Sequence, residues 1–222
     1  MGFRDYDRHS VRPDILAAHQ QFWQRLSRPG CYFRGAERVA IVAQARAART
    51  QPSSGAPREA QSADIPLSIA AAEAARTIAV DARGIDRAWF RRIADDLGEG
   101  AYVEGVAVTV QGIAVDAFAT AIGVPLEPLP TPQPGEPDAA LAAADDELAD
   151  VGAFVPMLRD FPGPNVARAL SLVPRDNLSF LSLVAAMYSL RDFQELVWKR
   201  PLSRTQVELL AARVSAVNEC FY

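Results

Sequence analysis

The residues of this chain that could do redox chemistry are Glu208 and Cys220, which stand twelve positions apart. A cysteine thiolate can attack peroxides and form disulfides, and a carboxylate can orient a group that transfers protons. In one straight helix twelve residues span about 18 Å, so the two side chains could not cooperate. Asn218 tolerates the left-handed conformation that ends helices. We therefore expect Cys220 to begin a second, antiparallel helix that passes Glu208, with its thiolate stabilised by the helix N-terminus.

The helix that carries Glu208 has a recognisable start. Ser203 and Gln206 form a capping-box pattern, in which a serine before the first turn pairs with a glutamine three residues later. Apolar residues then recur at the spacing of one buried helix face: Val207, Leu210, Ala211, Val214 and Val217. The sequence therefore predicts an amphipathic helix over 203–217.

The rest of the chain also has helical periodicity and contains no convincing alternating pattern of a strand. The expected helices cover 14–27, 35–49, 65–80, 87–97, 101–122, 165–172 and 178–188. Segment 101–122 is rich in β-branched residues, which favour strands, but it is too long for an ordinary strand and ends at Gly123 with Pro125 beyond. We expect a buried helix there, with Glu104 and Asp116 as capping or solvent-exposed charges in preference to the alternative that they form a polar pocket. The predicted class is all-α.

Six prolines between positions 125 and 137 divide the chain. Such a segment is extended and semi-rigid, and the acidic, alanine-rich stretch 138–150 continues it with partial helix. We expect a first helical domain over 1–124, a linker over 125–150 and a second unit over 151–222.

Composition excludes several classes of protein. A net charge of −4 and a pI near 5.3 argue against nucleic-acid binding, because there is no basic excess to neutralise phosphates. No secretory signal begins the chain and no uncharged apolar stretch is long enough to cross a membrane, so we expect a cytoplasmic protein without a membrane partner.

Cys31 lacks a partner motif and is expected to be structural. His9 and His19 lack the spacing of metal ligands, and we expect no metal and no cofactor.

The segments LSRTQVE (202–208) and NECFY (218–222) together resemble the alkylhydroperoxidase D-like group of the carboxymuconolactone decarboxylase superfamily. The motif of that group is Glu, eleven residues, Cys, two residues, Cys, three residues, His. Glu208 and Cys220 match it in identity and spacing, while the second Cys and the His would fall at positions 223 and 227. The segments GAERVAI (35–41), LGEGAYVE (97–104) and GVPL (123–126) resemble the same family more faintly, with Val39 opposite Glu208 and Gln51 opposite Cys220.

The resemblance implies two tandem alkylhydroperoxidase D-like helical units, the first without redox residues and the second incomplete. The arrangement is similar to the alkylhydroperoxidase-related (seleno)proteins, in which the second redox position can be selenocysteine, encoded by UGA. A UGA codon read as a stop would end the chain at Tyr222, inside the motif. We therefore expect this chain by itself to be inactive or nearly so.

The function that the resemblance implies is a thiol- or selenol-dependent peroxidase, or a dithiol oxidoreductase, that reduces hydroperoxides with a thiol reductant. Cys220 would resolve the oxidised intermediate, and Glu208 would orient the histidine. The alternative is a non-catalytic helical module that forms homo-oligomers or binds partners. Lactone decarboxylation, also found in the superfamily, uses no cysteine pair, and Cys220 weighs against it.

Overall fold

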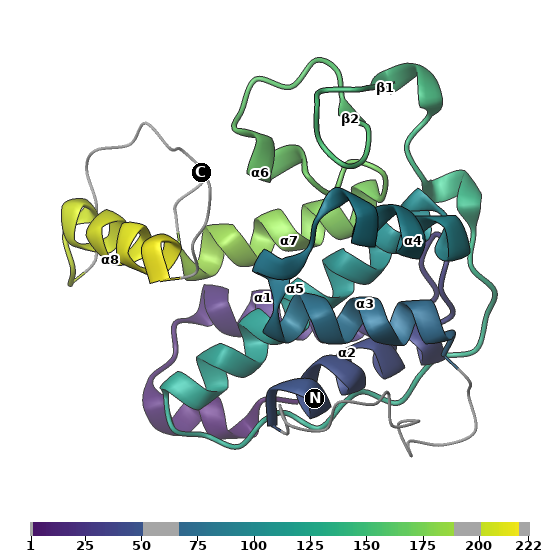
Figure 1. The fold of residues 1–222 in the computed structure, drawn as a ribbon. Helices are drawn as coiled ribbons and strands as arrows, with labels where there is room; N and C mark the ends of the chain where they lie inside the picture. The colour runs from purple at the N-terminus through teal and green to yellow at the C-terminus, as the bar shows by residue number, and fades with distance from the viewer. Residues whose placement is uncertain (1, 51–66, 189–200, 218–222) are drawn as a thin grey trace.

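The fold is all-α in the computed structural model, which describes residues 2–50, 67–188 and 201–217 (Figure 1). This confirms the predicted class. The α-helices are α1 (Pro13–Leu26), α2 (Gly35–Thr50), α3 (Ile69–Val80), α4 (Arg87–Leu97), α5 (Glu99–Ala121), α6 (Asn165–Arg168), α7 (Pro174–Met187) and α8 (Arg204–Val217). Short 3₁₀ helices cover η1 (Arg4–His9), η2 (Ala82–Gly84), η3 (Ala139–Leu141) and η4 (Asp145–Glu147).

Local signals in the sequence account for where these helices begin and end. Asp86 caps α4, its carboxylate accepting a 2.7 Å hydrogen bond from the backbone N–H of Trp89. Ser68 caps α3 in the same way through Ala71. After α5 the chain turns at Gly123, whose φ of 74° lies in the left-handed region that glycine adopts at helix ends.

Helix α5 is the centre of the packing, as Figure 1 shows. It packs against α2, α3, α4 and α7, and more lightly against α1. Its fully buried side chains include Ala107 and Val108, around which two apolar clusters of the core gather. The ambiguous segment 101–122 is therefore a buried helix, as predicted, because its β-branched residues meet apolar neighbours on several sides.

The proline-rich segment after α5 is extended and lies on the surface, which confirms that part of the prediction. Two hydrogen bonds also hold this segment against α1 and the residue that follows it. The indole N–H of Trp23 donates a 2.9 Å hydrogen bond to the carbonyl of Pro128. The backbone N–H of Gln133 donates to the carbonyl of Ser27 at 2.7 Å. The segment thus follows the α1–α2 side of the molecule instead of projecting from it.

Two details after the proline-rich segment differ from the sequence prediction. Helix α6 covers only Asn165–Arg168, and turns occupy the remainder of the expected 165–172 helix. A two-residue antiparallel ladder joins β1 (Leu148–Ala149) to β2 (Met157–Leu158). Ladders this short leave too little sequence for a period-two pattern to be detected.

Helix α7 joins the second half of the chain to the first. It packs along α1 and also contacts α5. Leu183 and Ala186 of α7 enter the same apolar cluster as Phe22 of α1. The division into 1–124, 125–150 and 151–222 stays a prediction, and the residues Gln51 and Cys220 of the proposed internal repeat lie outside the described residues.

Within the described part of the chain, α5 is the one helix long and apolar enough to cross a membrane, and 56% of its most apolar window is buried. Glu104 and Asp116 within it are ion-paired with Arg38 and Arg46. These features are those of the core helix of a folded domain.

Candidate functional site

The predicted site residue Glu208 lies on the exposed face of α8. Its carboxylate accepts a 2.8 Å hydrogen bond from the Tyr188 hydroxyl and lies 3.5 Å from the guanidinium of Arg204. Cys220, its predicted partner, lies outside the described residues. The structure therefore places one member of the pair and leaves their relation a prediction.

Both reciprocal hydrogen bonds of the capping box at the start of α8 are present. The backbone N–H of Gln206 donates to the Ser203 hydroxyl at 3.3 Å, and the N–H of Ser203 donates to the Gln206 side chain at 2.8 Å. These bonds fix the first turn, one turn before Glu208. The predicted helix is confirmed with its start.

The prediction that α8 buries one apolar face is wrong for the described part of the chain. No residue of α8 is buried. Leu210 is 57% exposed, Val214 58% and Val217 64%. Figure 1 shows the reason: α8 lies at the edge of the molecule beyond the end of α7, away from the α1–α5 core.

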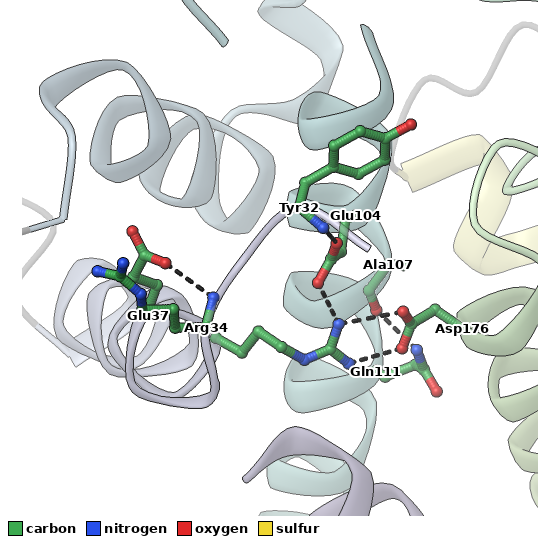
Figure 2. A network of polar contacts seen from close by, with 8 residues as sticks. Tyr32, Arg34, Glu37, Glu104, Ala107, Gln111 and Asp176 are labelled. Carbon is green, nitrogen blue, oxygen red and sulfur yellow. Dashed lines mark hydrogen bonds and ion pairs between the residues drawn. The ribbon is translucent and has the colours of Figure 1, made fainter. Parts of the chain in front are cut away.

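A second group of chemically active side chains lies deep in the core, where α2, α5 and α7 meet. The guanidinium of Arg38 donates to Glu104, and it also donates to Asp176 at 2.7 and 3.1 Å (Figure 2). The other oxygen of Glu104 accepts a 2.7 Å hydrogen bond from the backbone N–H of Tyr32. Arg38, Glu104 and Asp176 are each at most 2% exposed. We call these three residues the buried charge network.

Burial and the charges within the network shift the pKa values of Arg38 and Glu104. Burial opposes the charge of Arg38, but the carboxylates of Asp176 and Glu104 outweigh it and raise the pKa of the guanidinium. Burial raises the pKa of Glu104 above its usual value, against the opposing effect of Arg38. One guanidinium faces two carboxylates, so a buried negative charge is in excess, and the Glu104 pKa moves in the direction that relieves it.

An open cavity of about 420 Å³ adjoins the network. Its walls come from the C-terminal half of α1 and the first turns of α7. The lining residues are Gln21, Gln24, Arg25, Arg28, Pro29, Gly30, Cys31, Arg38, Leu141, Arg175, Asp176, Leu178, Ser179 and Ser182. We call it the arginine pocket, because four of these residues are arginines.

Cys31 is the cysteine that lies within the described residues. It lines the arginine pocket as a free, buried thiol. Burial raises its pKa to about 11, and the negative charges of Glu104 and Asp176 act in the same direction. A thiol with such a pKa is protonated at neutral pH and is a poor nucleophile. This agrees with the structural role expected for Cys31.

Metal-ligand geometry is not found among the described residues, where no three His, Cys, Asp or Glu side chains come together. His19 is fully buried in α1. Its Nδ1 lies 2.9 Å from the Tyr6 hydroxyl and its Nε2 lies 3.3 Å from the Met187 sulfur.

The expectation that Glu104 and Asp116 are capping or solvent-exposed charges is wrong. Both are buried within α5, and each is paired with an arginine of α2: Glu104 with Arg38, and Asp116 with Arg46 through two 2.7 Å hydrogen bonds. A carboxylate inside a long apolar helix is itself a signal of a buried partner.

The sequence pattern alone did not single out Arg38 or Asp176 as members of a site. Arg38 precedes Ile41, Val42 and Ala45 on the buried face of α2, at helical spacing. This position on the apolar face was the signal that could have identified Arg38 as a buried charge. Asp176 had none, because an acidic residue in a helix's first turn is ordinary.

Comparison with models of protein families, with curated proteins and with solved structures finds no match for this chain. The resemblance to the alkylhydroperoxidase D-like group therefore stays a prediction.

Proposed function

We propose that this chain belongs to a thiol redox protein that reduces hydroperoxides, with Glu208 and Cys220 in its site. The observation that supports this is the setting of Glu208. Its carboxylate is oriented by Tyr188 and Arg204 and yet remains open to solvent, on the helix that leads toward Cys220. A carboxylate so held can orient an imidazole for proton transfer.

The chemistry would follow the cysteine oxidation ladder. The second redox residue of the motif, as thiolate or selenolate, attacks a peroxide oxygen and breaks the O–O bond. It becomes a sulfenic or selenenic acid, and an alcohol leaves. The Cys220 thiol then forms a bond to that sulfur or selenium and water leaves, and a thiol reductant restores both residues.

The test compares the two cysteines in one protein. After peroxide treatment, a dimedone-type probe should label Cys220, read by peptide mass spectrometry, and leave the buried Cys31 unlabelled. In the protein extended by a cysteine at 223 and a histidine at 227, Glu208→Gln should lower the peroxidase activity, whereas Glu147→Gln, an exposed control outside α8, should leave it unchanged. Adding a cysteine at 223 and a histidine at 227 should create thiol-dependent peroxidase activity. Equal labelling of both cysteines, or no activity in the extended protein, would reject the proposal.

A second candidate function, assembly with a further copy of this chain, rests on a different observation. Helix α8 exposes Leu209, Leu210, Val214 and Val217, each at least 57% exposed. Contiguous apolar surface on a helix typically marks an interface, and a closed two-fold pairing is the commonest form of self-association.

Light scattering after size exclusion tests the assembly. The unchanged chain should run as an oligomer, and Leu210→Glu with Val214→Glu should shift it to the monomer. Thr205→Glu, at an exposed polar position of the same helix, is the control and should leave the mass unchanged. A monomeric parent protein would remove this candidate and leave the redox proposal untouched.

A further inference from the structure

The arginine pocket carries more positive charge than its surroundings neutralise. Arg25 lies in the last turn of α1, Arg28 lies in the loop just after it, and Arg175 lies in the first turn of α7. In the part of the chain that the structure describes, none of the three has a carboxylate within ion-pair distance. Both nearby carboxylates, Glu104 and Asp176, already bind Arg38.

The charges of the neighbouring arginines act on Arg25. Burial lowers the pKa of Arg25, and the charges of Arg38, Arg175 and Arg28 lower it further, while Asp176 opposes them. Arginines that converge on one cavity without a carboxylate of their own at ion-pair distance favour an anionic occupant.

The floor of the pocket supplies a second, independent observation. Arg38 is 1% exposed and lines the cavity, and its Nε–H is a buried donor without a hydrogen-bond partner among the described residues. Its two Nη groups are occupied by the buried charge network, to whose carboxylates the dashed lines in Figure 2 run. A buried donor without a partner is costly. The Nε atom has less than 1 Å² of exposed surface, so an occupant of the pocket reaches it only after a local shift of Arg38.

The remaining walls suit a polar ligand. Gln21 and Gln24 of α1 face the cavity together with Ser179 and Ser182 of α7. Amides and hydroxyls of this kind bind the hydroxyl groups of a small ligand. A cavity of about 420 Å³ is at the lower end of the range for small-molecule sites, and it is larger than a lone inorganic anion needs.

We propose that the arginine pocket binds a small, hydroxyl-bearing phosphate monoester. A guanidinium binds phosphate through two parallel hydrogen bonds, and a phosphate monoester offers three oxygens and close to two negative charges to several such groups at once. A carboxylate offers two oxygens and one charge, which matches three unpaired arginines less well. The site is independent of Glu208 and Cys220.

Calorimetric titration with ribose 5-phosphate, ribose and succinate tests the proposal. Ribose 5-phosphate should bind, ribose should not, and succinate should bind at least tenfold more weakly. Arg25→Gln and Arg175→Gln should each weaken ribose 5-phosphate binding by about tenfold or more, because each removes a bidentate contact. Arg91→Gln removes the same charge from an exposed position on α4 and should change the affinity less than twofold.

Circular dichroism establishes that the variants are folded, and thermal unfolding gives a second measurement. Ribose 5-phosphate should raise the melting temperature of the parent protein and of Arg91→Gln, but not that of Arg25→Gln or Arg175→Gln. Absence of binding at millimolar concentration, equal loss in Arg91→Gln, or equal affinity for succinate would each overturn the proposal.

Discussion

Asp176 and Arg38 are 138 positions apart in the chain, and two hydrogen bonds of 2.7 and 3.1 Å join their side chains in the core. Arg38 also binds Glu104, so a single guanidinium joins α2, α5 and α7. The contact crosses from the first helices to the second half of the chain. A charge network of this kind fixes which helices meet, because each member is costly to bury without the others.

Replacing Arg38 by leucine should therefore destabilise the protein strongly. The substitution leaves Glu104 and Asp176 buried without a cation, and breaking a buried ion pair from one side costs roughly 3–5 kcal/mol. Urea unfolding at pH 7 measures the change. Arg49→Leu, an exposed position on the same helix, should cost less than about 0.5 kcal/mol. A loss below about 1 kcal/mol for Arg38→Leu would contradict a structural role for the network.

Gly30 should not tolerate even a methyl group. A Cβ there would lie 1.9 Å from Oε1 of Glu104 and 2.4 Å from Nη1 of Arg38, so the network would have to move. We expect Gly30→Ala to lose about 1–3 kcal/mol of stability, the usual cost of overpacking.

Gly105→Ala is the matched control for the glycine change. A Cβ at that position would meet only Phe33 at 3.9 Å, an ordinary contact. Alanine is also the better helix former by about 1 kcal/mol, so this variant should be neutral or more stable in the same urea experiment. Equal effects of the two substitutions would show that the close approach at Gly30 has no energetic importance.

The helices were predictable from the sequence because their signals are local. The capping box at Ser203 and Gln206 and the glycine stop at Gly123 act over a few residues, and both are present. The central position of α5 in the packing could be inferred from the length of its apolar sequence. What α8 packs against could not, because a helical stripe indicates an apolar face without indicating whether another element covers it.

The buried charge network was not predictable for the opposite reason. Its members come from three helices separated by the proline-rich segment, and nothing local distinguishes Asp176 from an acidic residue that begins any helix. Only the mutual position of α2 and α7 gives Asp176 its partner. The arginine pocket depends on the same packing, since Arg25 and Arg175 lie far apart in the chain and meet where α1 contacts α7.

The last prediction concerns the pH dependence of stability. His19 is fully buried, and burial lowers its pKa from 6.5 to about 4. The folded state thus binds the proton more weakly than the unfolded state. His19 therefore contributes stability that is present above about pH 6.5 and is lost as the pH falls toward 4. Between pH 7 and pH 5 the loss should be about 2 kcal/mol, from 1.36 kcal/mol for each pH unit below 6.5.

Urea unfolding of the parent protein and His19→Gln across this range measures the effect. The variant should lose less stability on acidification, because glutamine does not titrate. Glu104 acts with the opposite sign, since its raised pKa favours the folded state as the pH falls, and the difference between the two proteins at each pH removes its contribution. His9→Gln replaces an exposed histidine and should keep the slope of the parent. The same slope in all three proteins would show that His19 is not a buried neutral imidazole in the folded protein.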